Sequence, residues 1–368
     1  MTEAPVTTCR SLGVAEAMRP AFFDLDLPAL EDGGVHVRTR FSGVSAGTEL
    51  AYVKGTDPGF TSYRDPDLGV FVPGRSSRSF PVQAMGYMEV GEVVASRRPD
   101  LAVGDLVAGA YGHRSEHVLA AGAVVVPVPD DVDPVLGIYL AQMGPICANG
   151  LLHAAAELAP GSDRRIGDGV SGRRVVVTGA GVVGLLVALL AQLHGADEVV
   201  VADPDPSRLA VAEALGLTTV DTSQTELWRW TKDRWQDGPG DRGADVVLQC
   251  RGRSDVLHAA LQCLRPQGSV IDLAFYQGGA PDLRLGEEFH HNGLTVRCAQ
   301  IGRVPRGLAD TWDRDRLAAE TTYLLRERGA DLLTHLVTDV VPVDDGPEAL
   351  LGLARRERST TQMVLAFD

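Results

Sequence analysis

Apolar and polar positions follow two different patterns along the chain. Between residues 35 and 128, short apolar or alternating stretches are separated by Gly, Pro and Asp turns, which predicts strands at residues 35–41, 87–95, 106–110 and 117–128. From residue 173 onward, continuous apolar runs alternate with stretches of helical spacing, which is typical of strands buried on both faces of a parallel sheet. The predicted fold class is therefore α/β, with a doubly wound parallel sheet joined to a β-rich domain.

The second pattern sets the expected organisation of the chain. Strands are predicted at residues 175–177, 199–202, 244–249 and 269–275, and helices at 136–158, 226–235, 254–264 and 314–327. Strand character returns at 340–343 and 362–367. We expect a substrate or catalytic domain at 1–150, a nucleotide-binding domain at 151–300, and a segment at 301–368 that returns to the first domain.

A glycine motif follows the first buried strand of the nucleotide-binding domain. Gly179, Gly181 and Gly184 form a G-x-G-x-x-G sequence at the start of an apolar helix, and the next strand ends at Asp203. The glycines permit a tight turn, close approach of the backbone to a pyrophosphate, and close packing of helix on strand. A carboxylate at Asp203 accepts hydrogen bonds from ribose hydroxyls and repels a 2′-phosphate, so the motif predicts NAD rather than NADP.

Other cofactor contacts are expected where the parallel strands end. We interpret Arg208 as a neighbour of the adenine rather than as a 2′-phosphate ligand, and Tyr276 either lies beside the nicotinamide or packs on the sheet edge. The remaining expected contacts are Val182, Val183, Cys250, Arg251, Gly252, Ala274 and Phe275.

Composition excludes several classes of function. The net charge of −15 argues against a nucleic-acid partner, because phosphate binding needs clustered basic residues. No N-terminal apolar segment indicates a signal peptide, and no apolar run is long and continuous enough to span a membrane. The five cysteines are scattered, which is typical of reduced thiols in a cytoplasmic protein. A Pro/Gly/Ser-rich segment at 57–82 is expected to be a long functional loop.

Three local motifs of the first half resemble the medium-chain dehydrogenase/reductase superfamily. Residues 42–50 resemble its G-x-C-G-[ST]-D segment, 86–93 its G-H-E-x-x-G-x-V segment, and 103–107 its V-G-D-x-V turn. The spelling S-A-G-T-E is most similar to the branch of bacteriochlorophyllide dehydrogenase-like proteins. The resemblance covers nearly the whole chain and implies a GroES-like catalytic domain, a Rossmann domain, a small-molecule substrate, and a homodimer or homotetramer paired through Rossmann sheet edges.

The same motifs depart from the zinc-binding members of the superfamily. By motif, Ala46 stands where a ligating Cys is expected, Tyr87 where a His is expected, and Met88 where a Glu is expected. Residues 142–145 supply neither a thiolate nor a carboxylate for a third ligand, and residues 84–125 lack the cysteines of a structural zinc lobe. Methyl and phenol groups are not ordinary zinc ligands, so we expect no metal.

Without a metal, a carbonyl substrate still needs a proton donor. Thr48 matches the proton-relay hydroxyl of the superfamily, and Tyr87 replaces a ligand, so its phenol is the leading acid/base candidate. Ser45 and Glu49 are further candidates, as is His290, because similar proteins carry a Phe-His pair after the last Rossmann strand. His113 and His117 have the spacing of a metal or proton-relay pair, although one surface and one structural histidine would give the same pattern.

The expected function is a zinc-independent, NAD-dependent oxidoreductase that interconverts an alcohol and a ketone on a polar hydroxylated molecule such as a sugar, a cyclitol or a secondary metabolite. Three alternatives are open. The first is an NADPH-dependent enoyl or quinone reductase, and the second is a redox-neutral enzyme that keeps NAD as an internal hydride shuttle. The third is a non-catalytic protein that has kept only the fold.

Overall fold

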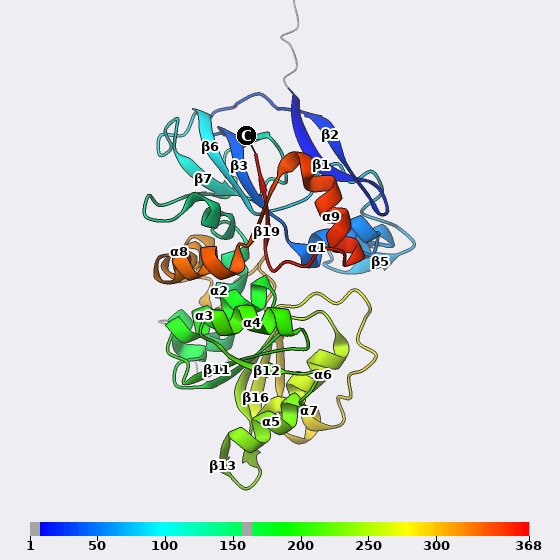
Figure 1. Ribbon diagram of the computed structural model, residues 1–368, viewed down its shortest axis with the longest axis vertical. Helices are drawn as coiled ribbons and strands as arrows, with labels where there is room; N and C mark the ends of the chain where they lie inside the picture. The colour runs from blue at the N-terminus through cyan, green and yellow to red at the C-terminus, as the bar shows by residue number, and fades with distance from the viewer. Residues whose placement is uncertain (1–7, 157–163, 368) are drawn as a thin grey trace, which may run out of the picture. The chain divides into compact units, whose positions relative to one another are not determined.

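The computed structural model describes residues 8–156 and 164–367, and it divides into two compact units (Figure 1). The first unit is the described part of Met1–Gln142 and Val337–Asp368, and the second is the described part of Met143–Leu336. These boundaries differ from those expected, because residues 301–336 belong to the second unit. Helix α8 (Arg314–Asp331) lies there and packs against helices α2 (Met143–Ala156) and α3 (Val182–Leu193).

The second unit is built on a parallel sheet. Among the described residues the sheet has six strands in the order β12-β11-β10-β15-β16-β17. The strands are β10 (Arg174–Thr178), β11 (Glu198–Asp203), β12 (Thr218–Asp221), β15 (Ala244–Gln249), β16 (Leu264–Asp272) and β17 (Thr295–Cys298). The strand order reverses between β10 and β15, and ligands bind such sheets at the carboxyl ends of the strands beside this point. The predicted doubly wound sheet is confirmed.

Helices cover the sheet in two groups. Helices α2, α3 and α8 contact one another, whereas α6 contacts α5, α7, β15 and β16. Right-handed crossovers explain this division, because β11 and β12 are added on one side of β10, whereas β15, β16 and β17 are added on the other side. The remaining elements of this unit are η3 (Ile166–Gly169), α4 (Pro206–Ala214), α5 (Leu227–Arg234), β13 (Gln236–Gly238), β14 (Asp241–Arg242), α6 (Ser254–Cys263), α7 (Glu288–His291), η4 (Arg306–Leu308) and η5 (Leu332–Leu336).

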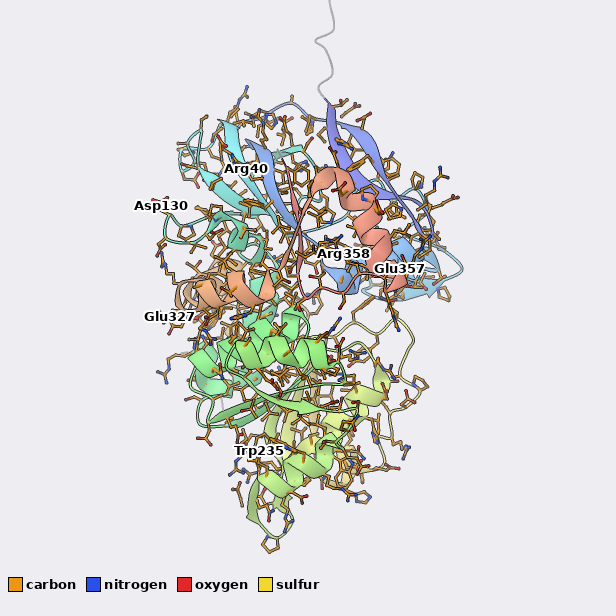
Figure 2. The ribbon with its side chains drawn as sticks, in the orientation of Figure 1. Arg40, Asp130, Trp235, Glu327, Glu357 and Arg358 are labelled. Atoms are coloured by element: carbon orange, nitrogen blue, oxygen red, sulfur yellow. The ribbon has the colours of Figure 1, made fainter. Side chains whose placement is uncertain are left out.

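Trp235, labelled in Figure 2, belongs to the hydrophobic core of the second unit. Its side chain is buried with Val176, Val200 and Val247, and its indole N–H donates to Glu198 Oε2 at 2.9 Å. Burial of a large ring with its only polar atom hydrogen-bonded is favourable. No helix in the described ranges is both long enough and apolar enough to cross a membrane.

The first unit is β-rich, as predicted. Among its described residues, one sheet has the order β18-β19-β3-β6-β7-β9. On the edge of β3 that faces away from β6, β19 pairs with residues 41–43 and β8 pairs with residues 35–38. Figure 1 shows β3, β6 and β7 side by side, with β19 next to β3. The strands of this sheet are β3 (Val35–Gly43), β6 (Glu89–Ser96), β7 (Leu106–Gly109), β8 (Glu116–Leu119), β9 (Val125–Pro127), β18 (Asp339–Pro342) and β19 (Met363–Ala366).

The sequence prediction for residues 117–128 was wrong. The strand expected there is two strands, because Gly122 has a φ of +80° and turns the chain between β8 and β9. The segment 57–82, expected to be a long functional loop, contains a short β4–β5 hairpin. The other elements are β1 (Thr8–Glu16), β2 (Arg19–Asp26), α1 (Ala46–Lys54), η1 (Pro58–Phe60), β4 (Ser62–Arg64), β5 (Phe71–Pro73), η2 (Pro134–Tyr139), η6 (Val343–Asp345) and α9 (Gly346–Arg355).

Gly184 tests the packing of α3 on β10. A Cβ atom at this position would lie 1.8 Å from the carbonyl oxygen of Gly179. We expect Gly184→Ala to lower the free energy of unfolding by about 1–3 kcal/mol, because the helix must move off the strand. Denaturant unfolding measures this effect, with Gly278→Ala as the control, since a Cβ there has no neighbour within 4 Å. Equal stability of the two variants would contradict the proposed close approach.

Candidate functional site

The glycine motif lies at the carboxyl end of β10, where α3 begins. Gly181 is the N-cap of α3, so the first backbone N–H groups of the helix, which have no partner within the helix, lie next to it. Gly179 has a φ of +101°, a value that other residues rarely adopt. Val182 and Val183 form the first turn of the helix. This geometry suits a phosphate group, because the helix dipole and the free N–H groups both favour an anion.

Asp203 holds the glycine loop in place. Its side chain is completely buried, and its two carboxylate oxygens accept the backbone N–H groups of Ala180 and Asp205, each at 2.9 Å. Two arginines lie nearby: Arg251 Nη1 is 3.7 Å from Asp203 Oδ2, and Arg208 Nη1 lies 3.8 Å from the point that a Cβ of Gly181 would occupy. The loop is therefore flanked by one carboxylate and two guanidinium groups.

The segments after β15 and β16 meet beside this loop. The backbone N–H of Cys250 donates to Thr178 O at 3.0 Å, and a Cβ at Gly252 would lie 2.1 Å from the carbonyl oxygen of Phe275. Only glycine permits this approach between Gly252 and the segment that carries Ala274 and Phe275. The structure thus brings together the two segments that the sequence assigned to the cofactor.

Tyr276 is fixed by two buried groups that the sequence analysis missed. Gln249 Nε2 donates to the Tyr276 oxygen at 3.2 Å, and the buried Asp272 also hydrogen-bonds the phenol. Burial, together with the Asp272 charge, raises the pKa of Tyr276 above its ordinary value. The available signal was the polar residue that ends each of two apolar strands, at Gln249 and Asp272.

A cavity of about 560 Å³ opens beside the glycine loop within the second unit. It is bounded by Gly179 on the loop, by Ala202 and Pro204 at the end of β11, and by Trp228 and Arg251. A cavity of this size between apolar and cationic walls is typical of a small-molecule site.

In the first unit, Tyr87 and Ser45 are joined through their hydroxyl groups. Ser45 is the N-cap of α1, but its side chain bonds the Tyr87 phenol instead of capping the helix. Thr48, in the first turn of α1, also hydrogen-bonds the phenol. Burial raises the pKa of Tyr87 more than these hydrogen bonds lower it, so the phenol keeps its proton at neutral pH.

The other two motif positions have no polar group to offer. Ala46 is exposed at the start of α1. Met88 is completely buried, and its Cε lies 2.9 Å from the position of a Cβ on Gly43. Among the described residues, the one group of three potential metal ligands within reach of one another is His258, Glu287 and Glu288, in the second unit.

Four polar side chains form a completely buried network beneath Tyr87. His113 Nε2 lies 2.6 Å from Glu49 Oε2, and His113 Nδ1 lies 2.5 Å from Ser42 Oγ. Ser42 Oγ is 3.1 Å from Glu89 Oε1. We call Glu49, His113, Ser42 and Glu89 the buried network. Sequence reasoning found Glu49 and His113 but missed Ser42 and Glu89, whose signal was a polar residue inside an apolar strand.

Backbone N–H groups complete the buried network. That of Ser45 donates to Glu49 Oε1 at 2.8 Å, and that of Tyr111 donates to Glu89 Oε2 at 2.7 Å. The backbone N–H groups of Gly112 and Met88 also hydrogen-bond Glu89. Burial raises the pKa of Glu89 above its ordinary value. Burial lowers the pKa of His113, but the neighbouring carboxylates, Glu49 above all, more than offset this and raise it.

The other candidate histidines lie elsewhere. His117 stacks on Tyr111 at 5.4 Å between ring centroids, and its Nδ1 lies 3.1 Å from Arg114 Nη1, so it is not part of the buried network. His290 is exposed in α7, with Arg173 and Gly293, at the amino ends of the Rossmann strands. The structure therefore does not place His290 with the glycine loop, because α7 precedes β17 and the cofactor segments follow their strands.

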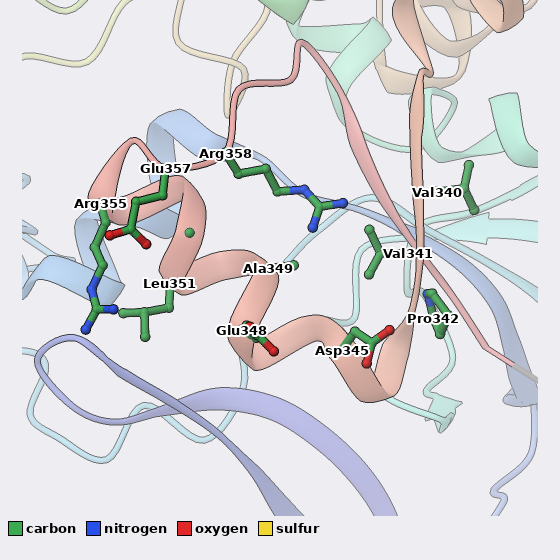
Figure 3. Close-up of a pocket in the computed structure, with 11 residues that line it drawn as sticks. Val340, Val341, Pro342, Asp345, Glu348, Ala349, Leu351, Arg355, Glu357 and Arg358 are labelled. Carbon is green, nitrogen blue, oxygen red and sulfur yellow. The ribbon is translucent and has the colours of Figure 1, made fainter.

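Another cavity, of about 770 Å³, lies in the first unit between β18 and α9 (Figure 3). Charged side chains surround it, among them Asp345, Glu348 and Arg355, and Arg358 is held by Asp339 at 2.7 Å. None of the sequence-predicted catalytic residues lines this cavity.

His117 makes stability depend on pH. Burial, with the charges of Arg114 and His36, lowers its pKa from 6.5 to about 4. The folded state therefore binds fewer protons than the unfolded state as the pH falls from about 6.5 to about 4, and up to about 3 kcal/mol of stability is lost over this range. Urea unfolding of wild type and His117→Gln at a series of pH values measures the loss. We expect the variant to lose less stability, and parallel curves for the two proteins would contradict the assignment.

Sequence comparison finds relatives among dehydrogenases. The chain is 27% identical over 330 residues to D-guloside 3-dehydrogenase of Escherichia coli, which covers 86% of this chain and 88% of that protein. It is 30% identical over 253 residues to L-threonine 3-dehydrogenase of Mesorhizobium japonicum, which covers 68% of this chain and 63% of that protein. Residues 182–314 match the family described as zinc-binding dehydrogenase.

Solved structures share the fold. An alcohol dehydrogenase from Thermotoga maritima is 20% identical with a TM-score of 0.72, and the match covers 98% of this chain and 100% of that one. A protein described as a zinc-binding dehydrogenase, from Sinorhizobium meliloti and bound to NADP, is 18% identical with a TM-score of 0.72 over 98% of this chain and 99% of that one. An alcohol dehydrogenase from Escherichia coli complexed with NADH is 14% identical with a TM-score of 0.72, over 98% and 100% of the two chains.

The fold and these relationships lead to one conclusion. Residues 182–314 match the zinc-binding dehydrogenase family, and over most of its length the chain is similar in sequence to a protein named as a sugar dehydrogenase and in fold to solved alcohol dehydrogenases.

Proposed function

We propose that this chain is a zinc-independent, NAD(H)-dependent oxidoreductase that interconverts an alcohol and a ketone on a polar hydroxylated molecule. The observation that carries the proposal is the hydrogen-bonded set of Tyr87, Ser45 and Thr48. Tyr87 occupies a motif position where the zinc-binding relatives are expected to have a ligand. A phenol held in its protonated form is a suitable acid for a carbonyl oxygen.

The residues present do not fit a catalytic zinc. Zinc sites of this kind need at least three N, S or O ligands, but the motif positions hold the methyl group of Ala46, the phenol of Tyr87 and the buried thioether of Met88. The zinc-binding dehydrogenase match spans 182–314 and does not include these positions. The family description therefore refers to the cofactor unit of this chain and supplies no support for a metal.

The second unit fits a nicotinamide cofactor. The glycine loop at Gly179–Gly181 and the N-terminus of α3 suit the pyrophosphate, and Asp203 with the adjoining cavity suits the adenosine. When bound, the cofactor supplies or accepts the hydride. The buried negative charge of Asp203 disfavours a 2′-phosphate, which supports NAD.

The residues of the first unit would handle the proton. In the direction of reduction, the Tyr87 O–H would donate its proton to the substrate oxygen. Ser45 and Thr48 hold the phenol and stabilise the phenolate that remains. In the direction of oxidation, the same oxygen takes the proton from the substrate hydroxyl.

The relatives support the substrate class. D-guloside and L-threonine, in the names of the two relatives, each carry a secondary hydroxyl beside further polar groups. The guloside enzyme matches most of both chains, so we place a glycoside or related polyol ahead of an amino alcohol.

A second candidate is an NADPH-dependent enoyl or quinone reductase. The observation that favours it is the pair of arginines near Asp203, since Arg251 and Arg208 are the groups that would bind a 2′-phosphate. Cofactor preference separates the two candidates.

Tyr87→Phe tests the proposed acid. It removes one hydroxyl and keeps the ring, so we expect turnover of methyl D-guloside with NAD+ to fall about a hundredfold while NADH binding is unchanged. Formation of NADH measures the rate, and fluorescence measures binding. Turnover of the wild type should also survive a strong chelator. Unchanged turnover in the variant, or loss of wild-type activity after chelation, would refute the proposed chemistry.

Cofactor titration tests the role of Asp203. We expect NADH to bind at least about tenfold more tightly than NADPH, because the buried carboxylate repels the extra phosphate. In Asp203→Ser this preference should shrink or reverse, since Arg251 then has no acidic partner. Tighter binding of NADPH to the wild type would support the second candidate instead.

A further inference from the structure

Helix α2 contacts the segments at the carboxyl ends of several parallel strands. Cys147 Sγ donates to Val183 O, in the first turn of α3, at 3.6 Å. A Cβ at Gly150 would lie 2.8 Å from Leu273 Cδ2, and Leu273 directly follows β16. Asn149 lies between these two contacts along the helix. We therefore asked which segment its polar side chain binds.

The side-chain amide of Asn149 binds the segment that follows β17. The side chain is completely buried, and its Nδ2 lies 3.3 Å from Gln300 O and 3.2 Å from Arg303 O. A carbonyl oxygen can only accept a hydrogen bond, so the NH₂ group must face both carbonyls, and this fixes the orientation of the amide. One helical turn later, on the same face of α2, His153 Nε2 lies 3.5 Å from Arg303 O.

Residues 299–303, which we call the β17 turn, are also held by their own backbone. The Ala299 N–H donates to Asp272 O at 2.8 Å, which joins the turn to the end of β16. Within the turn, the Arg303 N–H donates to Gln300 O at 3.3 Å. The side chains of Gln300 and Arg303 are exposed, whereas their carbonyl oxygens accept from the buried amide of Asn149. The β17 turn therefore has one side in solvent and the other held by α2.

The strand order indicates which half of the proposed cofactor the β17 turn would meet. The proposed pyrophosphate site follows β10, and the proposed adenosine site lies beside Asp203, at the end of β11. A dinucleotide bound across the carboxyl ends of such a sheet extends from there to the opposite side of the glycine loop. In this sheet β15, β16 and β17 lie on that opposite side. The nicotinamide half would therefore meet the segments that follow these three strands.

We infer that Asn149 is a positioning residue for the nicotinamide half of the cofactor, and that it acts through the carbonyl groups of Gln300 and Arg303. This inference rests on the proposed function for the presence of the cofactor. One buried amide binds both ends of a four-residue turn, so the backbone of the β17 turn is ordered before a ligand arrives. Ordering in advance lowers the entropic cost of binding. The groups proposed to bind the adenosine half lie at β10 and β11 and do not depend on this amide.

Binding of a whole and of a truncated cofactor tests the positioning role. Asn149→Leu has a side chain of similar volume but no donor. We expect the Kd of NADH to rise about tenfold, as for the loss of one or two hydrogen bonds, while the Kd of ADP, which has no nicotinamide, changes less than about twofold. Titration calorimetry of the full-length protein measures both constants. The fluorescence emission of bound NADH should also shift toward that of free NADH in the variant.

Thr321→Val is the matched control. It removes another completely buried hydrogen-bonding group of the second unit, bonded to Leu317 O at 3.0 Å, and it also packs on α2, at Gly144. We expect it to bind NADH and ADP as the wild type does. Equal weakening of NADH and ADP in Asn149→Leu, unchanged NADH binding there, or the same selective loss in Thr321→Val would overturn the inference.

Hydrogen exchange tests the contact without any cofactor. In the full-length protein, peptides that contain residues 299–303 should exchange faster in Asn149→Leu than in the wild type or Thr321→Val, because the turn has lost its link to α2. Unchanged exchange would overturn the role of Asn149. If Asn149→Leu does not fold, Asn149→Ala, which also lacks a donor, is measured against the same criteria. If the wild type binds neither NADH nor NADPH, the proposed function fails, and exchange still shows whether Asn149 holds the β17 turn.

Discussion

A carboxylate removed from water must find a positive charge, a set of donors, or a proton, because its burial alone costs several kcal/mol. In the first unit this constraint acts on Glu49 and Glu89, both completely buried within reach of one imidazole. Their donors come from β3, from the turn before β8, and from the start of α1. These elements meet at one point because the carboxyl groups there need partners, and the loops that carry Ser45 and Tyr87 are held at the same point.

The same constraint shapes the nucleotide end of the second unit. Asp203 is buried, and its oxygens accept the N–H groups of Ala180 and Asp205. Its charge therefore stabilises the open turn of the glycine motif before any ribose is present. The acid proposed to select the cofactor also holds the loop, so we expect a change at Asp203 to alter both binding and loop geometry. Arg251, at 3.7 Å, lowers the cost of burying the charge.

How far each feature could be predicted from the sequence depends on how far apart along the chain its interacting residues lie. The Rossmann unit was predictable because periodicity and the glycine motif are local, and β10, α3 and β11 follow from adjacent residues. The hairpin of β1 and β2 and helix α9 were not predicted, since their apolar pattern is short and their packing partners are distant in sequence. The prediction that His290 is a catalytic residue was based on a resemblance. Whether a residue reaches the cofactor depends on the face and the end of the sheet at which it lies, and sequence spacing determines neither.

The residues of the candidate site likewise fall into those carried by local motifs and those joined by contacts between distant strands. Tyr87, Ser45, Thr48 and Glu49 could be named because two motifs carry them, and the structure joins them through hydrogen bonds. Ser42 and Glu89 belong to the site only through a cross-strand register between β3 and β6. A single polar residue in an apolar strand indicates a buried partner but does not identify it, because the partner can lie on any neighbouring strand or turn. Tertiary contacts supply what spacing cannot.

In the proposed zinc-independent chemistry, the motif positions without metal ligands and the buried network belong to one electrostatic problem. A divalent cation at this place would offset the charge of nearby carboxylates, and a site without one must do so by other means. In this chain the ligand positions hold Ala46, Tyr87 and Met88, while Glu49 and Glu89 stay buried. The donors that meet these carboxyl groups are the His113 ring, the Ser42 hydroxyl and the backbone N–H groups of Ser45 and Tyr111, and the neutral phenol of Tyr87 adds no charge. Hydrogen-bond donors can therefore offset here part of the charge that a metal would offset.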